Sequence, residues 1–275
     1  MRRRDFLLTS LAGTVSLPAL RHAVGTADRI ERLGLQLYTV RDLFRADPEG
    51  TLRAVADAGY REVEFAGYVG RTPAQIRTML DAAGLEAPSA HIDLDAIEKQ
   101  WADTLAAARE IGHRYLVVAW IPAANRASLA KYRAVGSVLN RAGEAAARHG
   151  IRVAYHNHDF EFAPLEGGIG YDALIESLDP ALVSLELDLY WMTKAGRRPL
   201  DYFARLPGRF PMVHVKDMGP KGEMRDVGAG TIDFAAIFRQ REQAGIKHFF
   251  VEHDEPGDAL ASARASAKYL AALRF

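Results

Sequence analysis

Ionisable side chains with the chemistry of metal ligands and proton carriers recur at two-residue spacing in the second half of the chain. This spacing places side chains on one face of an extended strand. Burying two imidazoles beside two carboxylates is costly unless the groups pair or bind a cation. Imidazole nitrogen and carboxylate oxygen suit Mn²⁺, Co²⁺, Zn²⁺, Fe²⁺ or Mg²⁺, so the pattern indicates a divalent metal ion of open identity. The segments are Tyr155–Asp159, Glu186–Asp188, His214–Asp217 and Glu252–Asp254.

Each of these segments ends a short apolar run, and such runs alternate with stretches of helical period from Leu33 onward. This alternation is typical of βα units around a parallel sheet. Eight units predict an α/β fold, a single-domain (β/α)8 TIM barrel, whose active site lies at the C-terminal ends of the strands. The expected strands are Leu33–Leu37, Glu62–Phe65, Ala87–His91, Tyr115–Ala119, Arg152–His156, Val183–Asp188, Met212–Val215 and His248–Glu252.

The stretches between the strands have the length and composition of helices, and several stop at a glycine, as at Gly59 and Gly84. An open doubly wound sheet is the alternative architecture, but no glycine-rich phosphate turn of the GxGxxG type follows the first strand. The expected helices are Pro48–Ala58, Pro73–Ala83, Leu94–Ile111, Ala127–His149, Tyr171–Leu178, Leu200–Phe203, Phe234–Ala244 and Asp258–Leu273.

Four segments together resemble the sugar phosphate isomerase/epimerase family of the xylose isomerase-like barrel superfamily. The resemblance extends from the first expected strand to the last, and its specificity comes from the combination, since any one segment alone is weak. It implies a metal-dependent enzyme with a small-molecule carbohydrate substrate. The segments are Leu35–Arg41, Tyr155–His158, Leu187–Trp191 and His214–Asp217.

The resemblance also implies a set of metal ligands. Members of the superfamily hold the metal with an acidic residue on strand five, an aspartate on strand six, a histidine on strand seven and a glutamate on strand eight. Asp188, His214 and Glu252 match the last three positions. His156 stands where the fifth strand usually has a glutamate, and His158 is the alternative ligand.

This departure on the fifth strand bears on catalysis. Related ketose 3-epimerases use two metal-bound glutamates as an acid/base pair, of which only Glu252 remains. Proton abstraction next to a carbonyl stays feasible, because a metal polarises the carbonyl oxygen while a base removes the proton. The candidate bases are His158, Glu252 and Glu64. An unperturbed histidine pKa of about 6.5 would suit His158 to moving protons near neutral pH.

Further residues near the expected strand ends are candidates for substrate binding. Trp120 and Trp191 offer aromatic faces for a sugar ring, with core packing as the alternative. Arg209 offers planar donors to a hydroxyl or anionic group, or else forms a surface ion pair. His91 ends the third expected strand and is a further candidate for substrate binding. Lys216 either donates to substrate or, with Asp217, orients His214.

The leading functional hypothesis is a metal-dependent sugar isomerase, epimerase or lyase that abstracts a proton next to the carbonyl of a keto-sugar, such as a 3-keto-glycoside or an inositol-type ketone. One alternative is a metal-dependent hydrolase resembling endonuclease IV. Such an enzyme would carry ligands for several metals and a basic DNA-binding face. The other alternative is a non-catalytic periplasmic sugar-binding barrel. Oligomer formation is left open.

The first residues have the pattern of an export signal. Arg3-Arg4-Asp5-Phe6-Leu7 resembles the bacterial twin-arginine motif, and a mildly apolar stretch follows to Leu20. The apolar run is shorter than the roughly 20 residues that span a bilayer, which makes a membrane anchor the weaker interpretation. We therefore expect residues 1–27 to be a signal peptide, residues 28–275 to be the barrel, and the mature protein to be periplasmic or secreted, without a membrane anchor.

Charge and cysteine content argue against some functional classes of protein. Residues 1–27 hold four arginines and one aspartate, so their removal leaves 31 basic and 34 acidic residues, a net charge of −3. This balance lacks the basic excess expected of a nucleic-acid-binding protein. The chain contains no cysteine, which excludes disulfides, thiolate metal ligands and a cysteine nucleophile.

Overall fold

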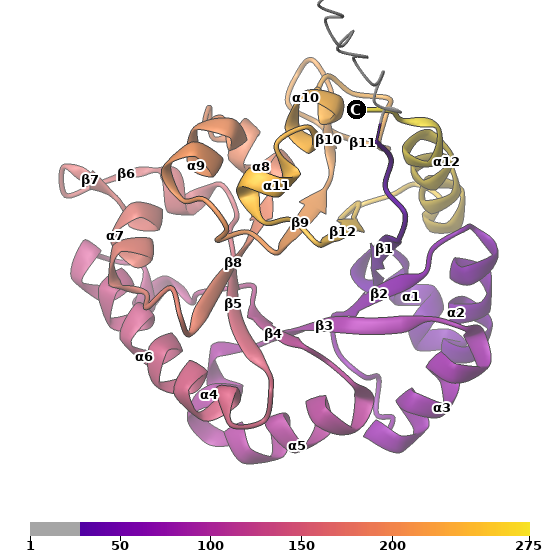
Figure 1. Cartoon of the computed structure of the whole chain (residues 1–275), viewed down its shortest axis with the longest axis horizontal. Coiled ribbons are helices and arrows are strands. Elements are labelled where there is room, and N and C mark those ends of the chain that lie inside the picture. The colour runs from indigo at the N-terminus through magenta and orange to yellow at the C-terminus, as the bar shows by residue number, and fades with distance from the viewer. Residues whose placement is uncertain (1–27) are drawn as a thin grey trace, which may run out of the picture.

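Eight parallel strands form a closed barrel in the computed structural model, which describes residues 28–275 (Figure 1). β1 pairs with β2 on one side and with β12, from the other end of the chain, on the other. The predicted (β/α)8 TIM barrel is therefore confirmed. In order around the barrel, the strands are β1 (Leu33–Gln36), β12 (His248–Val251), β9 (Met212–Val215), β8 (Val183–Asp188), β5 (Arg152–His156), β4 (Tyr115–Val118), β3 (Glu86–Ile92) and β2 (Glu62–Phe65).

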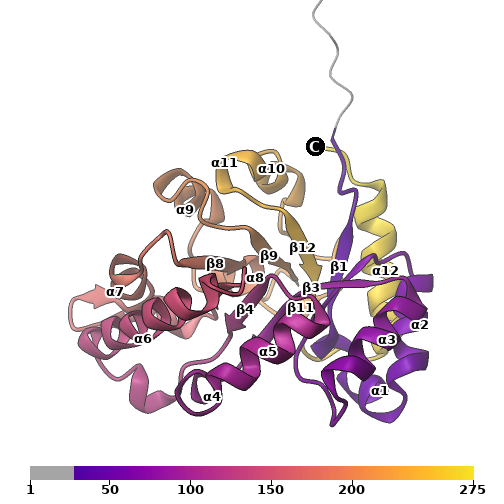
Figure 2. The same cartoon turned by 60° about the horizontal axis from the view of Figure 1, so that its bottom comes forward.

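Helices surround the barrel and cover the outer face of its strands (Figures 1 and 2). Two expected helices are each divided in the structure. Leu94–Ile111 breaks at Gln100, and Phe234–Ala244 breaks before Arg241. The helices are α1 (Arg41–Ala46), α2 (Pro48–Asp57), α3 (Pro73–Ala83), α4 (Leu94–Lys99), α5 (Trp101–Ile111), α6 (Leu129–Ala147), α7 (Gly170–Ser177), α8 (Leu189–Lys194), α9 (Pro199–Arg205), α10 (Phe234–Phe238), α11 (Arg241–Ala244) and α12 (Ala259–Ala272).

Short elements that the sequence did not predict lie in the connections. Three are single turns of 3-10 helix, and two are small antiparallel hairpins. The hairpin of β10 and β11 directly follows β9, so it stands at the C-terminal end of the barrel. These elements are η1 (Leu37–Val40), η2 (Ala123–Asn125), η3 (Phe160–Phe162), β6 (Pro164–Leu165), β7 (Gly168–Ile169), β10 (Asp217–Met218) and β11 (Met224–Arg225).

Glycines end several helices as the sequence predicts. Gly84, Gly112 and Gly245 cap α3, α5 and α11 with φ values of 65°, 97° and 85°. This left-handed conformation is strained for residues with a Cβ atom, and it lets the chain turn directly into the next strand.

The barrel interior changes from apolar to charged along its strands. A small apolar cluster, separate from the larger core between strands and helices, consists of Tyr115, Val117, Ala154, Met212 and Phe250. We call this cluster the apolar floor. Two residues further along three of these strands come ionisable side chains, because alternate residues of a strand share a face. These side chains are His156, His214 and Glu252.

The described segment begins and ends at one place. Asp28 N donates to Phe275 O at 2.8 Å, and Phe275 N donates to Asp28 O at 3.1 Å. Within residues 28–275, none of the helices has the length and apolar character needed to cross a membrane. The expected signal peptide, residues 1–27, lies outside the described residues.

Candidate active site

A cavity of about 770 Å³ opens at the C-terminal ends of the strands. Its volume falls within the usual range for small-molecule sites. The wall combines aromatic side chains with ionisable ones, as the sequence predicts for this end of the barrel. The lining includes His91, Trp120, His156, His158, Trp191, Lys216 and Glu252.

Three of the expected metal ligands converge beside this cavity. Asp188 ends β8, His214 lies on β9 and Glu252 follows β12, and all three are buried. His214 Nδ1 lies 2.8 Å from Glu252 Oε2 and 3.9 Å from Asp188 Oδ2. One ligand atom from each of the three lies within 4.8 Å of the others. Such spacing is compatible with their binding a single ion.

His156, rather than His158, lies beside this group. Its Nε2 is 3.8 Å from Asp188 Oδ2, and its Nδ1 is 3.3 Å from Glu186 Oε2. Asp188 Oδ1 accepts a hydrogen bond from Trp191 N at 2.8 Å and so caps α8. The other oxygen, Oδ2, therefore remains available to face the histidines. His156 also belongs to a second group of possible ligand atoms, with His91, Glu186 and His214, that lie within 4.8 Å of one another.

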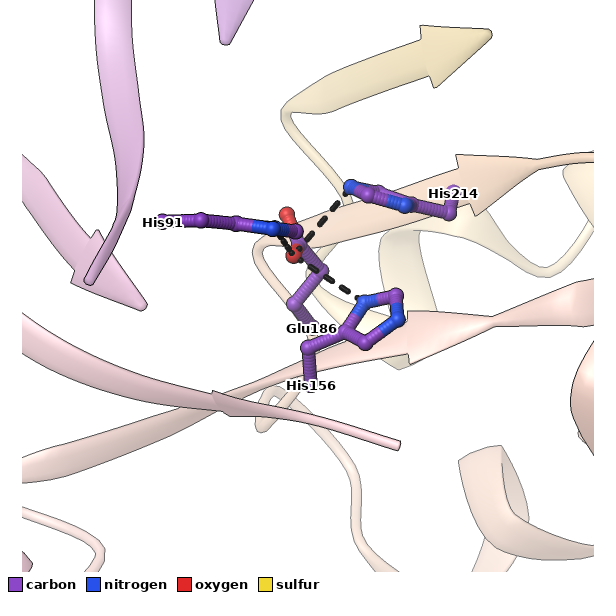
Figure 3. A group of neighbouring side chains, drawn as sticks. All are labelled: His91, His156, Glu186 and His214. Atoms are coloured by element: carbon purple, nitrogen blue, oxygen red, sulfur yellow. Dashed lines mark hydrogen bonds and ion pairs between the residues drawn. The ribbon is translucent and has the colours of Figure 1, made fainter. Parts of the chain in front are cut away.

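Two buried carboxylates lie beneath this group, and we call Glu64 and Glu186 the lower carboxylates. Glu186 Oε2 is 3.0 Å from His91 Nε2 and 3.2 Å from His214 Nε2, so its carboxylate lies among three imidazoles (Figure 3). Glu64 Oε2 lies 2.6 Å from His214 Nε2. Gln36 Nε2 donates to the same Glu64 oxygen at 2.8 Å, and the Ser89 hydroxyl donates to the other.

The charges of this layer compensate one another. Burial alone would raise the pKa of the Glu64 carboxyl, but His91 and His214 hold it well below its usual range. Burial alone would lower the pKa of His91, whereas Glu64 and Glu186 raise it to about 9. Without a metal, His91 is therefore a partly buried cation between two anions. Such pairing offsets part of the cost of burying each charge.

Lys216 brings a second buried cation to the carboxylates at the cavity. Its Nζ lies 2.7 Å from Glu252 Oε2, 3.1 Å from Asp188 Oδ2 and 2.8 Å from Asp254 Oδ1. Burial would lower the pKa of this ammonium, but Asp188, Glu252 and Asp254 raise it well above its usual range. Burial raises the pKa of Asp188 to about 6, against the effect of Lys216. This group of carboxylates thus requires positive charge.

The residues fit a divalent metal. Among the described residues, buried Asp188 Oδ2 and His156 Nδ1 make no well-aligned hydrogen bond, although Lys216 Nζ lies 3.1 Å from the first atom and Glu186 Oε2 lies 3.3 Å from the second. Nitrogen and oxygen donors of this kind suit borderline and hard divalent ions. His214 directs Nδ1 toward Asp188 and Glu252, because the lower carboxylates hold its Nε2. A metal at Nδ1 would displace a proton from that nitrogen.

His158 lies apart from the proposed metal ligands and is surrounded by aromatic side chains. Its ring stacks on Phe160 with centroids 5.6 Å apart, and it meets Trp120 edge-on at 5.2 Å. Trp191 lies 5.5 Å away. Burial, with Lys216 as a further cause, lowers the pKa of His158 to about 3. The unperturbed pKa that the sequence suggested is therefore wrong, and the ring is neutral near pH 7.

Three expectations from the sequence need correction. Arg209 precedes β9 and donates to Val183 O at the start of β8, so it lies at the N-terminal end of the barrel, away from the cavity, and its assignment to substrate is wrong. Glu64 does not line the cavity that the described residues form, and its oxygens are already bonded, which argues against its role as a base. Asp217 does not contact His214 but accepts hydrogen bonds from Gly228 N and Gly230 N.

The remaining substrate-binding candidates, Trp120, Trp191, Lys216 and His91, all line the cavity. Sequence reasoning did not assign Glu186, Gln36, Ser89 or Asp254 to the site. Glu186 had a detectable signal, since it shares a strand face with Asp188. Gln36 and Ser89 had none, because their role depends on neighbours across the barrel.

A closed parallel barrel with polar side chains at the C-terminal ends of its strands defines the TIM-barrel class of enzymes, and the His/Asp/Glu group here could bind a divalent metal. The chain belongs to the family described as xylose isomerase-like TIM barrel, which its residues 52–273 match. This finding agrees with the superfamily that the sequence motifs resemble.

The curated relatives that the chain matches are named inosose dehydratase. An inosose dehydratase of Lacticaseibacillus casei is 25% identical over 243 residues, 74% of this chain and 81% of that protein. An inosose dehydratase of Geobacillus thermodenitrificans is 28% identical over 142 residues, and the match spans 45% of this chain and 47% of that protein. This chain thus matches only about half the length of the second relative.

Solved structures share the fold. A sugar phosphate isomerase/epimerase from Parabacteroides distasonis superimposes with a TM-score of 0.78 at 25% identity, covering 92% of this chain and 97% of that one. A protein described as IOLI, with a bound zinc atom, superimposes with a TM-score of 0.68 at 14% identity, covering 86% of this chain and 95% of that one. The second likeness shows the fold alone.

Proposed function

We propose that the chain is a metal-dependent isomerase, epimerase or lyase that removes a proton next to the carbonyl of a keto-sugar. The observation that carries this proposal is the convergence of Asp188, His214 and Glu252 with His156 beside a cavity of sugar-accommodating size. These four residues are the proposed metal ligands. The names of the relatives support sugars and sugar-derived ketones as the substrate class.

A divalent metal held by Asp188, His214, Glu252 and His156 would supply electrophilic assistance at the carbonyl oxygen of the substrate. Glu252 and His158 both line the cavity and come from β12 and β5, which are separate strands of the barrel. In the proposed mechanism, a Glu252 carboxylate oxygen takes the proton from the carbon next to the carbonyl. His158, whose ring is neutral near pH 7, donates a hydrogen bond from a ring nitrogen to a substrate oxygen on its side of the cavity. Lys216 Nζ directs its three N–H groups to Glu252, Asp188 and Asp254 and so holds these carboxylates in position.

Deuterium exchange tests the proposal. Protein stripped with a chelator is reloaded with Mn²⁺, Co²⁺, Zn²⁺, Fe²⁺ or Mg²⁺ and incubated in D₂O with 3-keto-glycosides and inositol-type ketones. Deuterium uptake by the substrate is expected, and the product distinguishes the reactions. A lyase eliminates water from an inositol-type ketone or the glycosidic alcohol from a 3-keto-glycoside, whereas an epimerase or isomerase conserves mass. Absence of exchange with every metal and ketone would refute the proposal.

Asp188→Asn is the matched variant for this test. Asparagine is as good a helix N-cap as aspartate, so α8 should remain capped. The variant lacks the negative charge that the metal requires, and we expect it to lose metal binding and exchange together while the barrel stays folded. Isothermal calorimetry with the metal alone measures the first loss, and circular dichroism checks the fold.

We also propose that residues 1–27 direct export through the twin-arginine pathway, on the basis of Arg3-Arg4-Asp5-Phe6-Leu7. Fusion of this segment to a reporter that must be folded before export tests the proposal. Replacement of Arg3 and Arg4 by lysine should abolish export. Export of the lysine variant at the parental level would contradict it.

A further inference from the structure

A second cavity, of about 560 Å³, adjoins the first. Tyr38, His91, Ala119 and Trp120 line both cavities, so the two share a wall of residues rather than lying on separate faces. The second cavity extends from this shared wall over the ends of β2 and β3 toward α4 and α5. None of the four proposed metal ligands and none of the candidate bases lines the second cavity.

The second cavity has the chemistry of a site for an uncharged, hydroxyl-rich group. Asp93, Gln100, Asp103 and Thr104 contribute hydrogen-bonding side chains to its wall. Among the described residues that line it there is neither lysine nor arginine. Carboxylates accept hydrogen bonds from hydroxyl groups but repel phosphates and carboxylates. The wall therefore favours a neutral sugar over a phosphorylated one.

Two exposed aromatic side chains stand at the junction of the cavities. Trp120 is 48% exposed and Tyr38 is 42% exposed, although both are large and largely apolar. Trp120 is nevertheless held in place, since it packs edge-on against His158 at 5.2 Å and against Phe160 at 5.0 Å. Arg126 lies over the Trp120 ring, 4.9 Å from its centroid, and Arg41 lies over the Tyr38 ring at 4.2 Å, so a sugar ring would stack on the part of each aromatic ring that stays exposed.

The loop after β2 adds an independent observation. It supplies Ala66, Gly67 and Tyr68 to the second cavity. The next residue, Val69, has a φ of 46°, in the left-handed region. A β-branched residue rarely adopts this conformation, and such backbone strain concentrates at functional sites.

We propose that the second cavity binds a second sugar ring, joined through a glycosidic bond to the keto-sugar in the first cavity. The preferred substrate is then an uncharged keto-disaccharide rather than a free monosaccharide ketone. This inference rests on the proposed function for the identity of the reacting ring. The second cavity itself can be tested without turnover.

Two measurements test the inference. In the first, metal-loaded protein in D₂O is given a 3-keto-disaccharide or the methyl glycoside of the same 3-keto-sugar, and kcat/KM for exchange is compared. In the second, calorimetry compares binding of the unoxidised disaccharide with binding of the methyl glycoside of the corresponding unoxidised monosaccharide. This comparison requires no reaction. One stacked ring and one or two hydrogen bonds should favour the disaccharide about tenfold in both measurements.

A matched pair of variants locates the effect. Thr104 lies in α5 at the second cavity, and its hydroxyl donates to Gln100 O at 2.9 Å. Thr78, exposed on α3, makes the same bond to Ala74 O at 3.0 Å, outside both cavities. Thr104→Trp should fill the second cavity and reduce the disaccharide preference about tenfold. Thr78→Trp should keep the parental preference.

The outcomes separate the two proposals. Exchange at equal rates with both substrates, unchanged by Thr104→Trp, would overturn the second-ring site and leave the proposed reaction intact. Absence of exchange would refute the reaction, and calorimetry would still decide on the second ring. Equal or undetectable binding of the two unoxidised sugars would overturn the inference, whereas a preference lost only in Thr104→Trp supports it.

Discussion

Glu64 on β2 and His214 on β9 meet inside the barrel, with 2.6 Å between Oε2 and Nε2. Because an ionised carboxylate only accepts hydrogen bonds, this contact assigns a proton to Nε2. The opposite nitrogen, Nδ1, then faces Glu252 and Asp188. Glu64 thus acts through His214, as a residue that positions a proposed metal ligand.

Replacing Glu64 by glutamine tests this positioning role. A carboxylate behind a metal-binding histidine fixes the ring and increases its basicity, and its loss typically costs 10–100-fold in metal affinity. We therefore expect E64Q to bind metal about 10–100-fold more weakly than the parent, measured by competition with a chromogenic chelator.

Glu62→Gln is the matched control for E64Q. Glu62 Oε2 lies 2.7 Å from His248 Nδ1, a buried Glu–His pair on β2 and β12 at the N-terminal end of the barrel. E62Q should alter stability but keep the parental metal affinity. Equal losses of metal affinity in E64Q and E62Q would show that removing any buried Glu–His pair of the barrel weakens metal binding, and would contradict a specific positioning role for Glu64.

Lys216→Met removes the buried cation beside three carboxylates. Leaving buried charges unpaired typically costs 3–5 kcal/mol, so we expect the free energy of unfolding of the metal-free variant to fall by about that amount. Added divalent metal should restore more stability to K216M than to the parent, since it supplies the missing charge.

Urea unfolding with a chelator and then with metal measures both effects of K216M. Lys194→Met is the control, because Lys194 lines the same cavity but is exposed. It should change the free energy of unfolding by no more than about 0.5 kcal/mol. A K216M protein as stable as K194M without metal would contradict the prediction.

The strands were predictable because each is a short apolar run and several follow a helix that stops at a glycine, which are local signals. The break at Gln100 was not, since the residues on both sides of it have helical period. Asp188 and His214 were recognisable as strand-end polar residues. Arg209 was misplaced because proximity to a strand in sequence does not say which end of it a residue occupies.

The lower carboxylates mark the limit of sequence reasoning. Glu64 was correctly located at the second strand, but its partners Gln36, Ser89 and His214 come from three other strands. Such contacts depend on barrel closure and on the stagger between strands, which no local pattern encodes. The likeness to a family supplied ligand positions but not these supporting contacts.

His113, outside the site, should make stability depend on pH. Its Nδ1 donates to Ala87 O at 2.7 Å, so its Nε2 accepts from the Tyr68 hydroxyl at 2.9 Å. Burial lowers the pKa of His113 to about 4, and the Ala87 carbonyl only partly opposes it. The unfolded chain binds this proton at about pH 6.5, so stability should fall as pH drops from about 6.5 to 4, by up to about 1.4 kcal/mol per unit.

His113→Gln should flatten this dependence. Urea unfolding at pH 7, 6 and 5 gives the slope for the parent and the variant. The exposed His149→Gln serves as the control for removing a histidine from the chain. Parallel slopes for the parent and H113Q would rule out a contribution from His113.

Gly34→Val should destabilise the barrel. A Cβ on Gly34 would lie 2.4 Å from Cδ1 of Phe250, a residue of the apolar floor. Overpacking of this kind typically costs 1–3 kcal/mol. Adding Phe250→Leu makes room, so G34V/F250L should lose less stability than the two single losses predict, measured by urea unfolding. Strictly additive losses would argue against the clash.

The apolar floor and the ionisable residues above it have a consequence for strand register. Met212 and His214 are two positions apart, about 7 Å along the strand, and so are Phe250 and Glu252. A strand that slipped by two residues would keep its inward and outward faces but bring a charged side chain into the floor. The penalty for an unpaired buried charge opposes that slip. The residues proposed to bind the metal therefore also help to fix the register between neighbouring strands.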